Sequence, residues 1–467
     1  MKFRRHHALL VTALLVIGMA AFGRRASAAT ADAGTPITIE FWDFPRLPKT
    51  AAYLTEAMAR FERENPGVKI RYTRLPWQDG QQKVTLSVNS GRPPDVCGQV
   101  NVSPMYISQE VLEPLNDYLA DIKDDFYPDY LDAVTYRGQI YAIPWFKACY
   151  VALLNLDLFE KFGVEPPKNG RWTWGEFLKK MDALTTTVEG RQHYGLVTNL
   201  GPMEYEAYSI IYMNGGRIVS ARPDGTAEIG VNSAAFREGL QRLVDLEYKY
   251  KVCMPGVGAM TQEQSWNVWR DGRNCAVTFQ GGWCITAVQV ANEAVEETNA
   301  KKRAAGRLDE IEKPIHWAIA APPNDEGTTP ILGSSGLTTY VVFKQKDSRK
   351  RALCAKFARF LISGEGQKVL KYENCYPSLK STGNLWADNA ALGNVFELFP
   401  AGVMFPLVPG GERIDWVLQQ QIQKALLRDS RTGNPILTVD QATSEAFRRL
   451  EAVLDRGLRR FEAGTRK

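Results

Sequence analysis

Apolar and polar residues alternate along the chain in two patterns, one typical of strands and one typical of amphipathic helices. Residues 37–42 (Ile-Thr-Ile-Glu-Phe-Trp) alternate with a period of two, as in a half-buried strand. Residues 50–65 place apolar side chains from Leu54 to Phe61 at the i, i+3, i+4, i+7 spacing of a helix, and residues 68–72 resemble the next strand. Strand, helix and strand at this spacing form a βαβ unit, so we expect an α/β fold with a parallel sheet.

The same patterns predict further elements along the chain. We expect strands at 95–97, 138–144, 276–279, 313–320 and 337–343, and helices at 81–90, 174–184, 238–250, 349–363, 414–428 and 441–461. Thr173 is a suitable N-cap for the helix at 174–184. A chain of 467 residues exceeds the usual size of one hydrophobic core, so two domains are expected.

The first 28 residues have the pattern of an export signal. A positively charged start precedes the apolar run from Ala8 to Phe22, and Ala26-Ser27-Ala28 forms a small-x-small cleavage site. The apolar run, at roughly 15 residues, is short for a membrane span of about 20 residues. No cysteine lies near Ala28 to carry a lipid. We therefore predict an exported protein of the periplasm without a lipid anchor.

Charge and histidine content exclude several classes of function. The five basic residues of the signal segment account for the whole net charge of +5, so the exported chain is neutral. A neutral chain is a poor candidate for nucleic-acid binding, which needs clustered positive charge. Only His193 and His316 follow the signal, and they do not form a metal-binding motif. We therefore predict no metal, no cofactor and no nucleic-acid partner.

The seven cysteines are spread thinly and form no CxxC pair. An exported chain can form disulfides, and Cys354 with Cys375, or Cys253 with Cys275, are the two candidate pairs. The alternative, in which all seven are buried thiols, remains open at this stage.

Aromatic residues mark the ends of several predicted strands. Trp42, Trp77, Trp145 and Trp283 each follow a strand or lie beside a Pro or Gly turn. Ligands of open α/β sheets lie beyond the carboxyl ends of the strands. An indole face there can stack on the C–H face of a sugar ring while polar neighbours bind its hydroxyls. This arrangement favours a carbohydrate-binding cleft.

Paired carboxylates give a competing interpretation. Asp43 with Asp95, or Glu204 with Glu206, would suit the acid and base of a glycoside hydrolase. The chain contains no GxxxxGK[ST], GxGxxG or GxSxG motif. The sequence therefore leaves a binding protein, a secreted carbohydrate-active hydrolase and a binder of a non-sugar solute as alternatives.

A series of short motifs extends along most of the chain. In order, they are residues 61–68 (Phe-Glu-Arg-Glu-Asn-Pro-Gly-Val), 90–96 (Ser-Gly-Arg-Pro-Pro-Asp-Val), 138–144 (Gly-Gln-Ile-Tyr-Ala-Ile-Pro), 154–159, 172–177, 214–216 (Asn-Gly-Gly), 281–283 (Gly-Gly-Trp), 357–361 and 364–367. With these motifs the chain resembles the extracellular solute-binding proteins of ABC importers, the sugar-binding family that includes maltose-binding protein. The order and spacing of the motifs together make the resemblance specific.

The resemblance implies two α/β lobes joined by crossing strands, each lobe discontinuous in sequence. We place lobe one at 36–144 and 314–342, and lobe two at 145–313 and 343–467. The implied ligand-facing residues are Trp42, Asp43, Arg46, Gln99, Asn101, Ser334 and Ser335 in lobe one, and Tyr205, Tyr208, Trp283 and Trp416 in lobe two. Trp77 and Trp145 are added from the aromatic pattern, and Asp95 is expected to be structural.

The resemblance implies a monomer that is not an enzyme. Closure of the hinge captures a sugar, a polyol or an oligosaccharide, because neither lobe buries the ligand alone. The resemblance further implies that the closed form delivers the ligand to the permease subunits of an ABC transporter.

Overall fold

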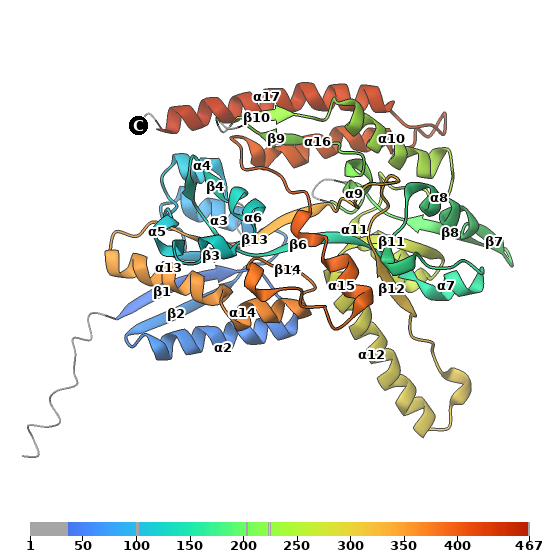
Figure 1. Ribbon diagram of the computed structural model, residues 1–467, viewed down its shortest axis with the longest axis horizontal. Helices are drawn as coiled ribbons and strands as arrows, with labels where there is room; N and C mark the ends of the chain where they lie inside the picture. Colours follow the sequence, from blue (N-terminus) through green and yellow to red (C-terminus); the bar gives the residue numbers. More distant parts are fainter. Residues whose placement is uncertain (1–35, 100–101, 202–203, 223, 225, 466–467) are drawn as a thin grey trace, which may run out of the picture.

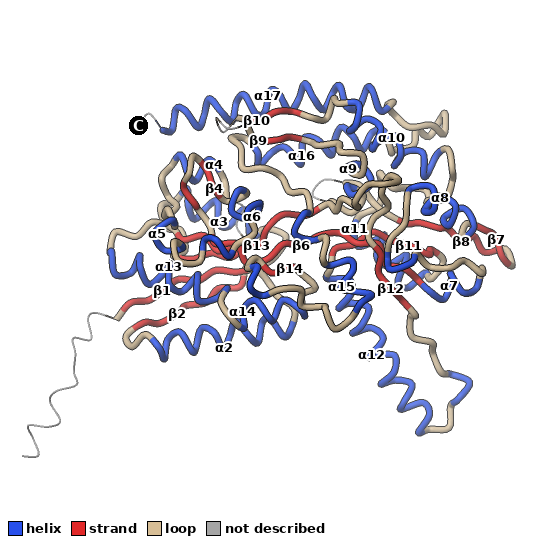
Figure 2. Tube along the Cα trace, viewed as in Figure 1, coloured by secondary structure: helices blue, strands red, loops and turns tan. Residues whose placement is uncertain are grey.

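One ten-stranded mixed sheet runs through both lobes of the protein (Figures 1 and 2). The computed structural model describes residues 36–99, 102–201, 204–222, 224 and 226–465. The predicted export signal at 1–28 lies outside the described residues. No helix among those described is both long and apolar enough to cross a membrane.

The predicted βαβ unit is confirmed at the start of lobe one. Strand β1 (Ile37–Asp43) pairs in parallel with β2 (Val68–Arg74) and with β3 (Val96–Gly98). Helix α2 (Pro48–Glu64) connects the first two strands, and α3 (Gly80–Asn89) connects β2 to β3. The apolar face of α2 is buried in the core of lobe one, as its helical spacing requires.

One long strand carries the chain from lobe one to lobe two. The first half of β6 (Ile143–Asn155) pairs with β13 (Ser334–Val342) and with β14 (Tyr376–Pro377). Its second half pairs with β11 (Cys275–Gly281) and β12 (Trp317–Ala320). The change of partners falls between Cys149 and Tyr150, which makes this point of β6 the crossover between the two lobes.

The remaining strands of the sheet belong to lobe two, which has a core on each face of the sheet. Strand β11 is parallel to β8 (Arg191–Val197), which pairs with β7 (Thr186–Val188), so the sheet order is β2-β1-β3-β13-β6-β11-β8-β7. Side chains of β6 alternate between two cores: Ala152 and Leu154 enter one, and Val151 and Leu153 enter the other.

Helices cover the sheet on both lobes. Lobe one carries α4 (Pro104–Ser108), α5 (Asn116–Leu119) and α6 (Pro128–Asp132), and the hairpin of β4 (Thr135–Tyr136) and β5 (Gln139–Ile140). Lobe two carries α7 (Leu156–Lys161), α8 (Trp174–Ala183), α9 (Tyr208–Tyr212), α10 (Ala234–Tyr248), α11 (Gln262–Asn267), α16 (Ile414–Ile422) and the hairpin of β9 (Val219–Ala221) and β10 (Ala227–Ile229). The predicted cap of α8 is confirmed, because Thr173 and Glu176 form a reciprocal capping box.

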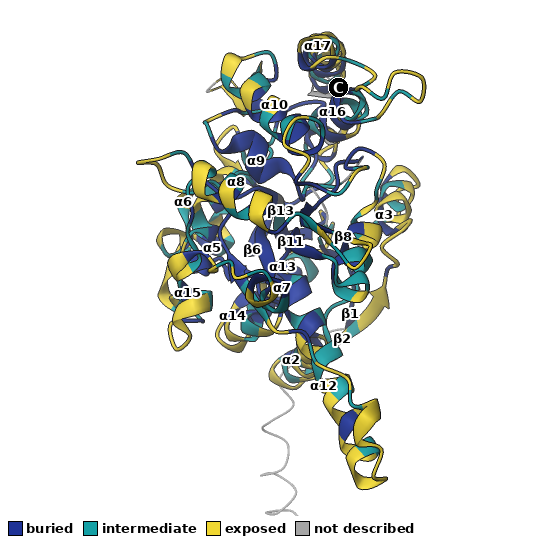
Figure 3. Cartoon of the chain, turned by 90° about the vertical axis from the view of Figure 1, so that its right-hand side faces the viewer, coloured by how far each residue is buried: buried dark blue, intermediate teal, exposed yellow. Residues whose placement is uncertain are grey.

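Helix α12 (Trp283–Ala304) was not predicted. It projects away from the body of the molecule, and its outer turns are exposed (Figures 1 and 3). Asn292 and Asn299, two turns apart, each bond both backbone groups of a residue on the returning chain, Ile315 and Glu312 respectively. These amide contacts fix the returning chain along the helix.

The last helix, α17 (Val439–Thr465), bridges the two lobes (Figure 1). Its apolar side, including Ala446 and Leu450, is buried in the core of lobe two. Near its C-terminal end, Phe461 is 4% exposed and meets the ring of Tyr136 from lobe one edge-on, with ring centroids 5.1 Å apart. The helix therefore contacts lobe one as well as lobe two.

The packing differs from the predicted lobe boundaries in two segments. Helix α13 (Ser348–Ile362) was assigned to lobe two with 343–467, yet its Phe357 contacts Phe41 edge-on at 5.2 Å in the core of lobe one. Helix α14 (Glu365–Lys368), also assigned to lobe two, contacts lobe one as well, because the carbonyl of Gly366 accepts a hydrogen bond from the indole N–H of Trp145 in the core of lobe one. Strand β12 was assigned to lobe one with 314–342 but pairs with the lobe-two half of β6.

Candidate functional site

A cavity of about 730 Å³ lies where the two lobes meet, and we call it the interlobe cavity. Its wall comes from the loop after β1, from β6 near the crossover, from β13 and from the first residue of α12. The polar and aromatic side chains on this wall are Arg46, Trp77, Gln81, Gln99, Phe146, Tyr150, Gln262, Trp283, Thr338 and Glu373. The volume is within the usual range of small-molecule sites.

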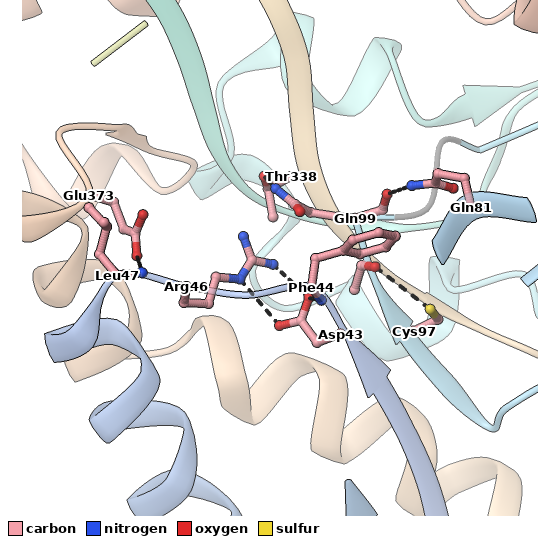
Figure 4. Close-up of polar contacts among 10 residues, drawn as sticks. Asp43, Phe44, Arg46, Leu47, Gln81, Cys97, Gln99, Thr338 and Glu373 are labelled. Atoms are coloured by element: carbon pink, nitrogen blue, oxygen red, sulfur yellow. Dashed lines mark hydrogen bonds and ion pairs between the residues drawn. The ribbon is translucent and has the colours of Figure 1, made fainter. Parts of the chain in front are cut away.

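Arg46 is held on the lobe-one side of the interlobe cavity by a buried ion pair with Asp43 (Figure 4). The guanidinium donates to Asp43 Oδ1 at 2.8 Å and to Oδ2 at 3.3 Å, and the two side chains are 3% and 0% exposed. The guanidinium also lies 5.0 Å from the centre of the Trp145 ring. Burial raises the pKa of Asp43, and the charge of Arg46 offsets part of that rise. Both oxygens of Asp43 are therefore engaged in positioning Arg46.

Gln99 lies in a strained loop conformation at the end of β3, with φ of 54°. Its backbone carbonyl accepts a hydrogen bond from Gln81 Nε2 at 2.7 Å, and its own Nε2 donates to Thr338 Oγ1 at 3.0 Å (Figure 4). Its side-chain oxygen is buried and has no hydrogen-bond partner among the described residues. The side-chain amide is thus fixed on the cavity wall, and its oxygen can still accept a hydrogen bond.

The loop after β1 is also tied to the segment that follows α14. The backbone N–H of Leu47 donates to Glu373 Oε1 at 3.0 Å (Figure 4). Glu373 is the one carboxylate among the described residues that line the interlobe cavity.

On the lobe-two side, Trp283 lies at the start of α12 with its ring half-buried. It meets Trp266 edge-on with centroids 5.2 Å apart. A Cβ on Gly281 would lie 2.9 Å from Trp283 Cδ1, so only glycine leaves room for the indole there. The local sequence Gly-Gly-Trp thus presents an aromatic face at the end of β11.

Gln262 is oriented by a buried polar network behind the lobe-two wall. Its Nε2 donates to Glu206 Oε1 at 2.6 Å, and its backbone N–H donates to Glu204 Oε1 at 2.8 Å. The amide of Asn199 donates to both carboxylates. Burial raises the pKa of Glu206 to about 7. The network fixes the amide of Gln262 at the cavity wall.

A second cavity, of about 160 Å³, adjoins the first, and we call it the side cavity. The two share Gly336 and Leu337 of β13 on their walls. Tyr205 lines the side cavity and stacks on Tyr150 of the interlobe cavity, with ring centroids 6.2 Å apart. The hydroxyl of Tyr205 donates to Asp415 Oδ2, and burial raises the pKa of Asp415 to about 7.

Comparisons with known proteins agree with the two-lobed fold. The family model described as bacterial extracellular solute-binding protein matches residues 56–393. This chain belongs to that family. A protein of Brucella abortus, named as a binding protein without a stated ligand, is 26% identical over 430 residues, which are 90% of this chain and 94% of the relative.

Two further relatives of this solute-binding protein have named ligands. The diacetylchitobiose binding protein of Streptomyces coelicolor is 28% identical over 350 residues, 73% of each chain. The solved structure of the cyclic α-maltosyl-1,6-maltose binding protein of Arthrobacter globiformis has a TM-score of 0.69 and 19% identity, and the match covers 90% of this chain and all of that one. The structural likeness confirms the two-lobed α/β fold.

The cavities of the solute-binding protein bring together five of the predicted ligand-facing residues. Arg46, Trp77, Gln99 and Trp283 line the interlobe cavity, and Tyr205 lines the side cavity. Trp77 is 58% exposed and packs on the ring of Phe44 with centroids 4.9 Å apart. Their roles as ligand contacts remain predictions.

Other predicted residues are buried away from the cavities. Trp145 is fully buried and donates from its indole N–H to the carbonyl of Gly366 at 2.7 Å. Tyr208 is 1% exposed and stacks on Tyr212, with ring centroids 5.5 Å apart. Ser334 is the first residue of β13, and its hydroxyl donates to the carbonyl of Ala148. Packing and internal hydrogen bonds engage these three side chains.

The remaining predictions divide into three cases. Trp42 packs partly buried against the core of lobe one and lines neither cavity, because β1 turns its neighbours Phe41 and Asp43 inward. Trp416 is 52% exposed and also lines neither cavity. Asn101 and the side chain of Ser335 lie outside the part of the chain that the structure describes.

The carboxylate pairs considered for hydrolysis have structural partners. Asp95 accepts from the backbone N–H of Glu40 at 2.7 Å and pairs with Lys350 at 2.7 Å, as expected of a structural residue. Glu204 and Glu206 lie together but orient Gln262 from behind the wall. Neither pair appears on the described wall of the interlobe cavity.

The cavity residues that were not predicted from the sequence include Gln81, Phe146, Tyr150, Gln262, Thr338, Glu373 and Asp415. Tyr150 and Phe146 lie inside the apolar run of β6, where nothing local separates a cavity residue from a core residue. Gln262 follows Thr261, whose capping box with Gln264 was a signal for a helix start at this point.

Proposed function

We propose that this solute-binding protein captures a carbohydrate in the interlobe cavity and delivers it to an ABC importer. The observation that carries the proposal is the pairing of aromatic faces with fixed amides on opposite walls of one cavity. Trp77 and Trp283 offer surfaces for stacking on sugar rings, and Gln99 and Gln262 offer oriented hydrogen-bonding groups. The carbohydrate ligands named for two relatives support the same ligand class.

Hinge closure at the crossover of β6 would couple ligand binding to a change from the open to the closed form of the protein. A ligand shifts such an equilibrium only through its contacts with both lobes. Shifting the ratio of closed to open molecules from 1:99 to 99:1 needs a ligand that binds the closed form about 5.5 kcal/mol more favourably than the open form. A micromolar complex provides about 8 kcal/mol in total, so a moderate affinity is sufficient.

The cellular setting belongs to the same proposal. Residues 1–28 direct export to the periplasm, and the protein acts there as a monomer without a lipid anchor. The permease subunits of the transporter recognise the closed form, and the ligand leaves unchanged, because the protein is not an enzyme.

The proposal is tested by thermal-shift screening of the exported chain against sugars, sugar alcohols and oligosaccharides. A ligand at 100 times its Kd should stabilise the protein by about 2.7 kcal/mol. A shift with amines or phosphate esters, and none with any carbohydrate, would contradict the sugar ligand. Recovery of the shifting sugar by chromatography separates the alternatives, since a binding protein returns it intact and a hydrolase does not.

A further inference from the structure

A buried carboxylate without a counter-charge lies on the wall of the side cavity. Asp415, in the first turn of α16, is 8% exposed. One of its oxygens accepts from the hydroxyl of Tyr205, and the other has no hydrogen-bond partner among the described residues. No described Lys, Arg or His forms an ion pair with it. An ionised carboxylate in such a place is costly unless a partner arrives.

The rest of the side cavity is largely apolar and aromatic. Leu337, Phe405 and Val408 form much of its wall, and the rings of Tyr205 and Phe405 meet edge-on with centroids 6.1 Å apart. Aromatic faces attract a nearby cation, and low polarity strengthens its attraction to a carboxylate. A volume of about 160 Å³ has room for one ring or one substituent of a larger ligand that extends from the interlobe cavity.

The charges around the two cavities disfavour an anionic ligand. No described Lys or Arg lines the side cavity, and the one guanidinium on the described wall of the interlobe cavity, Arg46, is already paired with Asp43. A ligand carboxylate or phosphate would meet Asp415 and Glu373 without a free cation to receive it. Like charges brought together in this way reduce affinity.

We propose that the side cavity binds a protonated amino group of the ligand at Asp415, so that the captured carbohydrate is a basic amino sugar. This inference rests on the proposed function, since it names the class of carbohydrate. An ammonium group donates to the carboxylate of Asp415, neutralises the buried charge and lies against the aromatic wall.

The test is isothermal titration calorimetry at pH 7 with matched pairs of sugars. Glucosamine, galactosamine, mannosamine and chitobiose are each compared with the neutral sugar that carries a hydroxyl in place of the amine: glucose, galactose, mannose and cellobiose. We expect at least one amino sugar to bind tenfold or more tightly than its neutral counterpart. Equal or tighter binding of the neutral sugar in every pair that binds overturns the inference and leaves the proposed function standing. Absence of binding by all four amino sugars also overturns the inference, whereas the proposed function fails only if the wider thermal-shift screen finds no carbohydrate ligand.

Two variants test whether Asp415 is responsible for the preference for the amino sugar over its neutral counterpart. Asp415→Asn keeps the shape of the side chain and removes its charge, so the tenfold preference should fall to about one. Asp455→Asn removes the same charge from an exposed position on α17 and should leave the preference unchanged. A preference that survives in Asp415→Asn overturns the inference. The comparison of sugars on the unaltered protein decides the question even if Asp415→Asn fails to fold.

Discussion

Replacing Asp43 by Ala tests the buried ion pair that positions Arg46 at the interlobe cavity. The substitution leaves the guanidinium, 3% exposed, without the carboxylate that balances its charge. Breaking a buried ion pair by removing one partner typically costs 3–5 kcal/mol, because the other charge stays buried. We therefore expect Asp43→Ala to lower the free energy of unfolding by about 3–5 kcal/mol. The double variant Asp43→Leu/Arg46→Met should lose much less, because no uncompensated charge remains.

Urea denaturation followed by tryptophan fluorescence measures the loss, and hydrogen exchange assigns it to a lobe. Protection should fall in β1 and β3 of lobe one before it falls in β8 of lobe two, because the lobes have separate cores. The control is Lys83→Ala, which breaks an exposed pair with Asp79 at 3.2 Å and should cost at most about 1 kcal/mol. A cost of Asp43→Ala no greater than that of this control, or a double variant as unstable as the single one, would show that the ion pair does not stabilise lobe one.

Three further predictions concern pH, the last helix and the cysteines. Burial raises the pKa of Asp415 from 3.8 to about 7, so its contribution to stability is greatest at low pH and is lost as the pH rises toward 7. Asp415→Asn should therefore flatten the pH dependence of the apo melting temperature between pH 4 and 8, and an unchanged curve would contradict this. Phe461→Ala should remove the contact of α17 with Tyr136, lower the free energy of unfolding by about 3 kcal/mol and weaken ligand binding through the hinge. The control Arg459→Ala, at an exposed position, should change neither the melting temperature nor the affinity. All seven cysteines are buried free thiols. Seven thiols should therefore react with a thiol reagent in denaturant, and none should react rapidly in the native protein. Fewer than seven reactive thiols in denaturant would indicate a disulfide.

The local elements could be predicted because their signals are local. The helical spacing of 50–65 and the strand alternation of 37–42 each depend on neighbours in sequence, and both elements are confirmed as α2 and β1. Helix α12 was missed although its composition suits a helix. Its first residue, Trp283, follows two glycines that resemble a turn and carries no side-chain cap.

The lobe boundaries and the cavity residues could not be read from the sequence, because they depend on long-range pairing. Trp77 and Trp145 both follow an apolar residue and a proline, yet one is 58% exposed on the cavity wall and the other is fully buried. The difference arises from β6, because Trp145 lies inside this strand, whose first half pairs with β13 and β14. Asp415 resembled an ordinary acid in the first turn of a helix, where the helix dipole already favours it.

Calorimetric titration of a sugar found in the thermal-shift screen measures whether the interlobe cavity binds a carbohydrate. The titration compares the unaltered protein with Trp283→Ala and with Trp416→Ala, an indole that lines neither cavity. We predict one binding site per chain, a loss of about 2 kcal/mol in Trp283→Ala, roughly 30-fold in Kd, and no change in Trp416→Ala. The apo melting temperature of Trp283→Ala should fall only slightly, because its ring is half-buried. An unchanged Kd in Trp283→Ala, or an equal loss in both variants, would contradict the account.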